Sequence, residues 1–148
     1  MLYVLATPIG NLQDITLRAL NVLLSVDFIA AEDTRHTGRL LKGRNPKGRF
    51  ISYHEHNEEK RTPLLLEKLE AGFSVAVVSN AGTPSISDPG FRLVESAVAR
   101  NIPVSPVPGV SAAIAALSVS GLPTDSFVFI GFLSRKKGRR TEQLTSLR

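Results

Sequence analysis

The sequence predicts an α/β fold: a mostly parallel five-stranded sheet with helices on both faces. Five short apolar runs rich in β-branched residues alternate with segments in which apolar residues recur at helical spacing. The connections between them are short, which is typical of parallel strands joined by helices that cover both faces of the sheet. Three of these runs end in loops of glycine, proline and small hydroxyl residues, which indicate a ligand site at one edge of the sheet.

In the first half of the chain, strands are predicted at residues 2–7, 28–31 and 49–53, where apolar runs give way to polar turns. The first strand is followed by leucines at helical spacing, which predict a helix that ends near residue 25. Asp14 and Thr16 are predicted to cap this helix, because their side-chain oxygens can accept from the first free N–H groups.

The second and third helices are predicted from their capping residues. Thr34 is expected to cap a helix that continues through Leu41 and that Gly43 would end. Thr62 and Pro63 are predicted to be the N-cap and the first residue of the next helix, because proline suits a position whose N–H needs no partner.

The second half continues the alternation. Strands are predicted at residues 73–79 and 102–107, and helices at residues 91–100 and 110–119. The first of these strands leads into a loop with two glycines and two prolines, through which regular structure cannot continue.

A break then divides the chain into two predicted domains. Residues 1–120 are expected to form the α/β domain and residues 121–125, with Gly and Pro, a linker. Residues 126–148 are expected to open a second α/β domain, with a strand at 126–132 and the start of a helix at 141–148. The alternative is that the strand joins the first sheet.

Composition excludes several classes of protein. The 148 residues contain no cysteine, which excludes a disulfide scaffold and thiolate metal sites and fits a reducing cytoplasm. The first residues carry no basic segment of the kind found in signal peptides. Residues 101–124 carry no charge, but four prolines among them argue against a membrane span, so no membrane partner is expected.

The formal net charge of +5 is unevenly distributed. Residues 1–133 are balanced, and the whole excess lies in residues 134–148, where six basic residues face Glu142 alone. Such an asymmetry indicates a partner, and it says nothing about the fold.

Three loops are predicted to meet at the carboxyl edge of the parallel sheet: residues 8–11, 80–90 and 108–112. Their small residues would let the backbone approach a ligand closely and leave N–H groups free to bond it. An ordinary strand-to-helix turn is the alternative for the central loop. Neither a dinucleotide fingerprint nor a P-loop is present, so a different nucleotide-like ligand is expected.

Five motifs in a fixed order carry a resemblance to a known family. They lie at residues 5–16, 31–35, 53–58, 81–90 and 108–112. With them the chain, from residue 2 to 140, resembles the bacterial small-subunit ribosomal RNA methyltransferase I family, within the tetrapyrrole methylase superfamily. The resemblance implies transfer of a methyl group from S-adenosylmethionine to a cytidine 2′-hydroxyl of 16S ribosomal RNA.

The resemblance also implies two α/β domains with the donor between them, of which this chain would be the first domain and the opening of the second. It further implies the small ribosomal subunit as partner, a homodimer when the protein is full length, and a cytoplasmic location. A helix N-terminus and loop amides would suit the carboxylate of the donor. The residues expected at the donor are Pro8, Ile9, Gly10, Asn80, Ala81, Gly82, Thr83, Ile86, Ser111 and Ala112.

The chain departs from the family pattern at two positions. Asn80 stands where the family usually has aspartate. The amide of Asn80 keeps an oxygen that can accept a hydrogen bond but lacks the negative charge. Ser134 stands where proline is usual.

Transfer to a ribose hydroxyl needs the oxygen aligned with the methyl group and a group that helps to remove its proton. The polar candidates near strand ends are Glu32, Asp33, Arg35, His54, Glu55 and His56. A structural network of ion pairs is the alternative for each of them. His54 and His56 would lie on one face of a strand, but the pattern does not demand a matching carboxylate cluster and methyl transfer needs no metal, so no metal site is predicted.

The basic run is predicted to be a flexible arm that binds RNA phosphates, because Gly138 interrupts it and no acidic residue is interleaved. Its residues are Arg135, Lys136, Lys137, Arg139 and Arg140. A solvated charge run is the alternative. Two rival functions are a sister methylase with another acceptor, against which the basic arm argues, and a non-catalytic RNA-binding fragment.

Overall fold

The computed structural model describes residues 1–147 and contains one sheet of five parallel strands in the order β3-β2-β4-β1-β5. Each strand lies within a predicted strand and is at most three residues shorter. The strands are β1 (Leu2–Leu5), β2 (Phe28–Ala31), β3 (Arg49–Ser52), β4 (Val75–Val78) and β5 (Val104–Val107).

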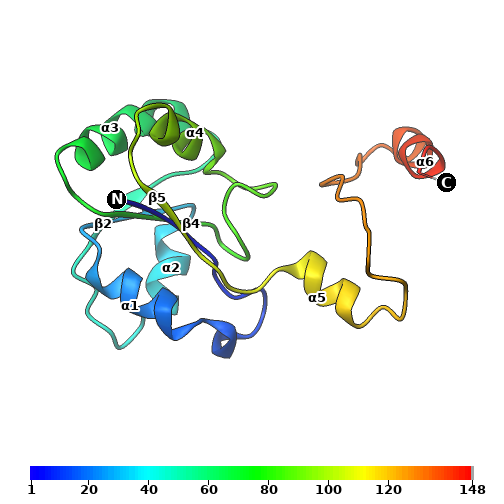
Figure 1. Ribbon diagram of the computed structural model, residues 1–148, viewed down its shortest axis with the longest axis horizontal. Helices are drawn as coiled ribbons and strands as arrows, with labels where there is room; N and C mark the ends of the chain where they lie inside the picture. Colours follow the sequence, from blue (N-terminus) through cyan, green and yellow to red (C-terminus); the bar gives the residue numbers. More distant parts are fainter. Residues whose placement is uncertain (148) are drawn as a thin grey trace.

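The sheet is covered on both faces, as predicted: α1 and α2 lie on one face and α3 and α4 on the other (Figure 1). The helices are α1 (Leu17–Ser25), α2 (Thr34–Leu40), α3 (Glu58–Glu70), α4 (Phe91–Ala99), α5 (Ala112–Ser118) and α6 (Lys137–Thr145), with a 3₁₀ turn, η1 (Leu12–Asp14). Within residues 1–147, no helix has the length and hydropathy needed to cross a bilayer.

The central strand β4 explains the two-layered core. Its side chains alternate, so that Val75 and Val77 pack under α3 and α4 while Ala76 and Val78 pack under α1 and α2. All four are at most 2% exposed. A strand buried on both faces must be apolar at every position, which is why this run shows no alternation in the sequence.

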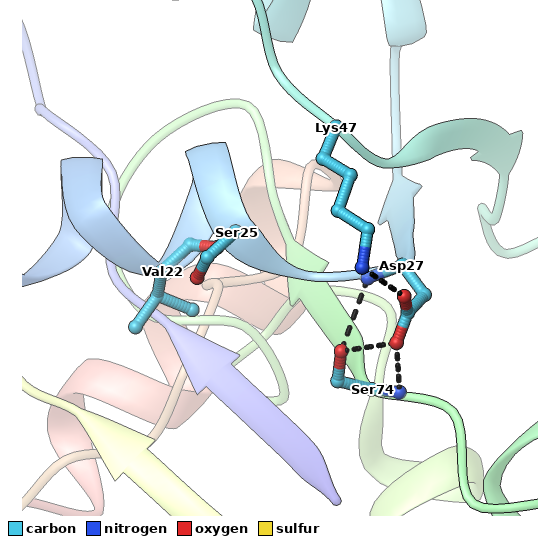
Figure 2. A network of polar contacts seen from close by, with 5 residues as sticks. All are labelled: Val22, Ser25, Asp27, Lys47 and Ser74. Carbon is cyan, nitrogen blue, oxygen red and sulfur yellow. Dashed lines mark hydrogen bonds and ion pairs between the residues drawn. The ribbon is translucent and has the colours of Figure 1, made fainter.

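The amino edge of the sheet is fastened by Asp27, which precedes β2 (Figure 2). Its carboxylate accepts from the N–H and the hydroxyl of Ser74, at 2.9 and 2.7 Å, and from the Lys47 ammonium at 2.9 Å. In return, the Asp27 N–H donates to the Ser74 hydroxyl at 3.0 Å. This cluster, the Asp27 clamp, joins the starts of β2 and β4. The Ser74 N–H first of all, and then Lys47, lower the pKa of Asp27 far below its usual range.

Two helix starts differ from the prediction. The side chain of Asp33, and not Thr34, caps α2 by accepting from Arg35 N and His36 N at 2.8 and 3.3 Å. Asp14 does not cap α1. It lies in the preceding 3₁₀ turn, and Thr16 alone caps the helix, as predicted for it.

The third helix begins at Glu58 and not at the predicted cap, Thr62. Thr62 lies inside the helix because its hydroxyl is used elsewhere: it donates to the Glu58 carbonyl at 2.7 Å and pairs with the Tyr53 hydroxyl at 3.0 Å. Both side chains are buried. Pro63 is therefore an interior residue of α3, and tertiary packing overrides the local capping pattern.

The predicted strand at residues 126–132 is not formed, because no strand of the described chain lies beside it to accept its hydrogen bonds. These residues lie outside the sheet, between α5 and α6 (Figure 1), and a Cβ on Gly131 would lie 3.4 Å from the Ser87 hydroxyl oxygen of the central loop. Helix α6 begins at Lys137, four residues before the predicted start, so the basic run is partly helical and not a flexible arm throughout. Arg148, the last residue of the predicted helix, lies outside the described residues.

Candidate functional site

The loops after β1 and β4 are bonded to each other at the carboxyl edge of the sheet. Thr7 N donates to Gly82 O at 2.9 Å, and Gly82 N donates to Thr7 O at 3.0 Å. The buried Thr7 hydroxyl adds a bond to Ser79 O at 3.1 Å. The N–H of Gly82 is therefore used within the protein, which corrects the expectation that it is free for a ligand. Gly82 instead holds the two loops in a fixed relation.

The loop after β5 joins them by a close backbone approach. A Cβ on Gly109 would lie 2.9 Å from the Cβ of Ala6, too close for any other residue without movement. Ser111 then caps α5 by accepting from Ile114 N at 3.5 Å. The three loops predicted to meet at this edge do so, because all three follow parallel strands.

A cavity of about 460 Å³ lies between these loops, and we name it the apolar cavity after the side chains that line it. Seven of the ten predicted donor residues line it. Pro8 and Gly10 do not, and Asn80 lines a neighbouring cavity instead. The residues that line the apolar cavity are Ile9, Ala81, Gly82, Thr83, Ile86, Ser87, Asp88, Ser111, Ala112, Ala113, Phe129, Gly131 and Phe132.

The central loop holds its shape at a conformational cost. Ser85 and Ser87 have φ of +71° and +61°, values that favour glycine. The N–H of Ser85 donates to the carbonyl of Pro89 at 3.2 Å, and a Cβ on Gly90 would lie 2.8 Å from the Ser85 hydroxyl oxygen. Two non-glycine residues in this region cost about 1–2 kcal/mol each. Strain of this size concentrates at functional sites, where a fixed backbone is needed.

A second cavity of about 410 Å³ adjoins the first, and we name it the polar cavity. It gathers five of the six polar candidates for catalysis. Arg35, the sixth, is exposed and does not line it. The residues that line it are Glu32, Asp33, His54, Glu55, His56, Asn80, Ser87, Asp88 and Pro89.

The carboxylates of the polar cavity differ in their hydrogen bonds and in the direction in which their surroundings shift the pKa. Glu32 Oε2 accepts from Asn80 N at 2.9 Å. The N–H groups of Arg35 and His36 lower the pKa of Asp33, because both donate to its ionised form. Burial, and secondarily the negative charge of Glu32, raise the pKa of Asp88.

Three further polar atoms at this edge have no partner within the described chain. Asn80 Oδ1, His54 Nδ1 and Ser85 Oγ are buried from solvent and make no hydrogen bond among residues 1–147. An unpaired buried polar atom is costly, and it is expected where a ligand completes the bonding. No group of three or more His, Cys, Asp or Glu side chains in the described part of the chain is arranged to hold a metal ion.

A third cavity of about 660 Å³ lies between α3 and α4 and the central loop, and we name it the α3–α4 cavity. Glu58, Arg92 and Glu95 contribute its charges together with Glu55 and Asp88. Arg92 Nε lies 3.5 Å from Glu58 Oε1, so its positive charge is already paired.

The basic run lies apart from these cavities. Its predicted RNA-binding residues are exposed and line none of the three cavities: Arg135, Lys136, Lys137, Arg139 and Arg140. The run begins just beyond Phe132, which contributes to two of the cavities. The structure therefore connects the run to the site along the chain and does not place its charges inside it.

The sequence model of one protein family, described as tetrapyrrole (corrin/porphyrin) methylases, matches residues 1–147. The chain belongs to the tetrapyrrole methylase family. Among solved structures, the chain resembles the uroporphyrin-III-C-methyltransferase of Thermus thermophilus, with a TM-score of 0.59 and 27% identity, over 82% of this chain and 52% of that one.

Several curated relatives of this chain carry one name, ribosomal RNA small subunit methyltransferase I. The protein from Synechocystis sp. is 57% identical over 147 residues, which is 99% of this chain and 53% of the relative. That from Escherichia coli O157:H7 is 55% identical over 94% of this chain and 49% of the relative. The chain therefore spans about half the length of the curated relatives it matches.

Sequence reasoning missed four residues that line the apolar cavity: Ser87, Asp88, Phe129 and Phe132. Asp88 follows the small-residue run of the central loop, and a lone carboxylate in such a loop could have marked it as a candidate. The two phenylalanines could not be found this way, because they lie in a segment that was predicted to be a strand of another domain.

Proposed function

We propose that this chain forms the donor-binding part of an S-adenosylmethionine-dependent methyltransferase that modifies the 2′-hydroxyl of a cytidine in bacterial 16S ribosomal RNA. The observation that carries the proposal is the apolar cavity, where three loops bring seven of the predicted donor residues together. The shared name of relatives that are 51–57% identical supports the RNA acceptor.

The residues of the apolar cavity fit the donor. A volume of about 460 Å³ lies within the roughly 300–1,000 Å³ usual for small-molecule sites. Ile9, Ile86 and Phe129 offer apolar surface to an adenine ring. At Gly82, a Cβ would lie 3.7 Å from Ile9 Cγ2, so a side chain there would extend into the space between the loops. Bound there, S-adenosylmethionine would supply an electrophilic methyl group on a positively charged sulfur.

The acceptor is proposed to enter the polar cavity, which shares Ser87 and Asp88 with the apolar cavity. A carboxylate-rich cavity accepts hydrogen bonds from hydroxyl and amino groups and repels phosphate. The RNA backbone would therefore stay outside, where the basic residues around α6 can bind its phosphates. Action on ribosomal RNA would place the protein in the bacterial cytoplasm.

Two proposals concern the whole protein. Residues 1–120 form the donor domain and residues 126–148 belong to a second domain, joined by a linker at 121–125. The support is that Phe127, Val128 and Phe132 are 53, 78 and 85% exposed, as expected of side chains that another domain covers. The complete protein is proposed to be a homodimer, an inference that rests on the family resemblance alone.

The test is a binding measurement followed by a transfer measurement. Calorimetry should detect S-adenosylmethionine and S-adenosylhomocysteine binding to the chain. With the complete protein, small ribosomal subunits that lack the modification should then gain a methyl group that blocks alkaline cleavage at one cytidine, whereas the 148-residue chain alone is expected to be at best weakly active. Donor binding with transfer to a tetrapyrrole, and none to the subunits, would support a sister methylase instead. RNA binding without donor binding would indicate a non-catalytic RNA-binding fragment.

A further inference from the structure

We propose that Asp88 is the proton acceptor of the methyl transfer, an inference that rests on the proposed function. The carboxylate has a position that no other ionisable side chain of residues 1–147 shares. It lines the apolar cavity, the polar cavity and the α3–α4 cavity. Among the described residues, it is the one ionisable side chain on the wall of the apolar cavity.

The wall between two cavities is where a transfer between their occupants must take place. A methyl group held in the apolar cavity and a hydroxyl held in the polar cavity can meet only at the residues that the two cavities share, Ser87 and Asp88. Of these two, Asp88 carries a carboxylate and can take a proton. Ser87 has a φ of +61°, so the backbone that presents Asp88 is held in a defined and strained conformation.

The charges that face Asp88 favour a methyl acceptor that carries no negative charge. On the side of the polar cavity they are Glu32, Asp33 and Glu55, with His54 and His56. On the side of the α3–α4 cavity, Glu58 and Glu95 add two more carboxylates, and the one cation, Arg92, is paired with Glu58. These carboxylates would repel a phosphate, whereas a ribose hydroxyl can donate a hydrogen bond to them.

The other carboxylates of the polar cavity, Glu32, Asp33 and Glu55, do not line the apolar cavity. Glu32 is also bonded to the Asn80 N–H at 2.9 Å. Asp33 caps α2, and the two N–H groups from which it accepts lower its pKa. Burial and the charge of Glu32 raise the pKa of Asp88, which makes its carboxylate a stronger proton acceptor than that of Asp33.

The step balances with the groups named. A lone pair of the ribose oxygen forms the new bond to the methyl carbon, and the carbon–sulfur bond breaks with its electron pair left on sulfur. The hydroxyl proton passes to the Asp88 carboxylate. The positive charge of the sulfonium and the negative charge of the carboxylate are both consumed, so the product is neutral S-adenosylhomocysteine beside a protonated Asp88, which then releases its proton to solvent.

The experiment uses the difference in charge between the two forms of the donor. The pKa of Asp88 is measured by carbon NMR in the 148-residue chain, saturated in turn with S-adenosylmethionine and with S-adenosylhomocysteine. The sulfur of S-adenosylmethionine carries a positive charge and that of S-adenosylhomocysteine does not. If Asp88 faces this sulfur, its pKa should therefore be lower by about one to three units in the complex with S-adenosylmethionine. Equal pKa values in the two complexes would overturn the proposal.

A matched pair of variants gives a second readout by calorimetry. Asp88→Asn should weaken binding of S-adenosylmethionine about tenfold or more relative to S-adenosylhomocysteine, because a shift of one pKa unit is linked to a tenfold change in affinity. Glu95→Gln removes a carboxylate that lines the α3–α4 cavity but neither of the others, and should leave that ratio unchanged. An unchanged ratio in Asp88→Asn would also overturn the proposal.

The two possible failures are distinguishable. A wild-type chain that binds neither form of the donor contradicts the proposed function, and the role of Asp88 is rejected with it. If the chain binds both forms and the pKa of Asp88 is the same in the two complexes, the proposed function stands and only the role of Asp88 is rejected.

Discussion

Gly82 shows how one residue can set the relation between two loops. Its φ of +80° lies in the region that favours glycine, and its N–H and carbonyl both pair with Thr7. Gly72, which follows the end of α3, has a similar φ of +89° but precedes the amino end of β4, opposite the edge that holds the apolar cavity, with open space where a Cβ would be. The two glycines therefore share a backbone requirement and differ in their surroundings.

Gly82→Val should abolish donor binding, because the strained backbone would shift both loops and the new side chain would extend toward Ile9. Gly72→Val is the matched control, since it imposes a similar strain of about 1–2 kcal/mol without touching the cavity. Calorimetry with S-adenosylhomocysteine, alongside urea unfolding, separates the effects. Unchanged donor affinity in a folded Gly82→Val chain would show that the donor does not bind here.

At the same scale, the sequence predicted which loops meet at the apolar cavity but not the position of Asp88. Gly82, Thr83 and Ile86 follow a buried strand, and parallel topology alone places such residues at the shared edge. The position of Asp88 between two cavities depends on the path of the loop through two serines with positive φ. Serine does not favour that conformation, so no local rule predicts it.

At the scale of elements, the Asp27 clamp fastens the first residues of β2 and β4. The folded state keeps the pKa of Asp27 below its value in the unfolded chain, so the folded state binds the proton less readily. The clamp therefore contributes stability at pH values above the unfolded pKa, near 4, and this contribution is lost as the pH falls toward the folded pKa.

Asp27→Asn should accordingly lower the free energy of unfolding most at neutral pH, and the difference from the wild-type chain should shrink steadily below about pH 4. Urea unfolding at a series of pH values measures it. Asp125→Asn, at an exposed position with no hydrogen bond or ion pair among residues 1–147, is the control and should show no such trend. A difference for Asp27→Asn that is constant with pH would contradict the role assigned to its charge.

Helix α6 carries its positive charges at the wrong end for its own stability. Lys136 is the N-cap, and Lys137, Arg139 and Arg140 fall in the first turn, where the helix dipole is also positive. Each such charge is unfavourable by about 0.3–1 kcal/mol, and a bound anion would relieve the repulsion. This arrangement fits a surface for phosphate better than a solvated charge run.

Removing four of these charges should weaken RNA binding and flatten its dependence on salt by about 0.7–0.9 in log–log slope for each lost phosphate contact. The variant is Arg135→Ala, Lys136→Ala, Arg139→Ala and Arg140→Ala together. Alanine favours helix, so the content of α6 should hold or rise in circular dichroism, which separates lost contacts from lost structure. Donor affinity should not change, because none of the four lines the apolar cavity.

The matched control removes four exposed basic residues of the sheet domain: Lys42, Arg44, Lys60 and Arg61. It changes the net charge equally, so a general electrostatic effect would flatten the slope in both variants. An unchanged slope in the α6 variant, or a loss of donor binding with RNA binding intact, would contradict phosphate binding by this helix.

For the molecule as a whole, the sequence predicted the parallel strands of the sheet but not their order, and it predicted one strand that does not form. Alternating apolar runs and helices impose parallel neighbours, and every predicted strand up to residue 107 is present. The run at 126–132 has the same β-branched and aromatic character, yet it forms no strand, because a strand needs a partner. A local sequence pattern indicates a preference for extended structure, but it does not show whether a partner strand lies beside it.

This difference leads to a prediction about where the folded unit ends. Every residue of the two core clusters lies before residue 108, and residues 119–130 are exposed throughout. A chain cut after Ser120 should therefore unfold cooperatively in urea, with a free energy within about 0.5 kcal/mol of the 148-residue chain, because exposed positions contribute little. A chain cut after Asn101 is the control. It lacks β5, with Val107 of the core, and should lose several kcal/mol or fail to fold. If the cut after Ser120 were as damaging as the cut after Asn101, residues 121–148 would be part of the first domain, and the proposed boundary would be wrong.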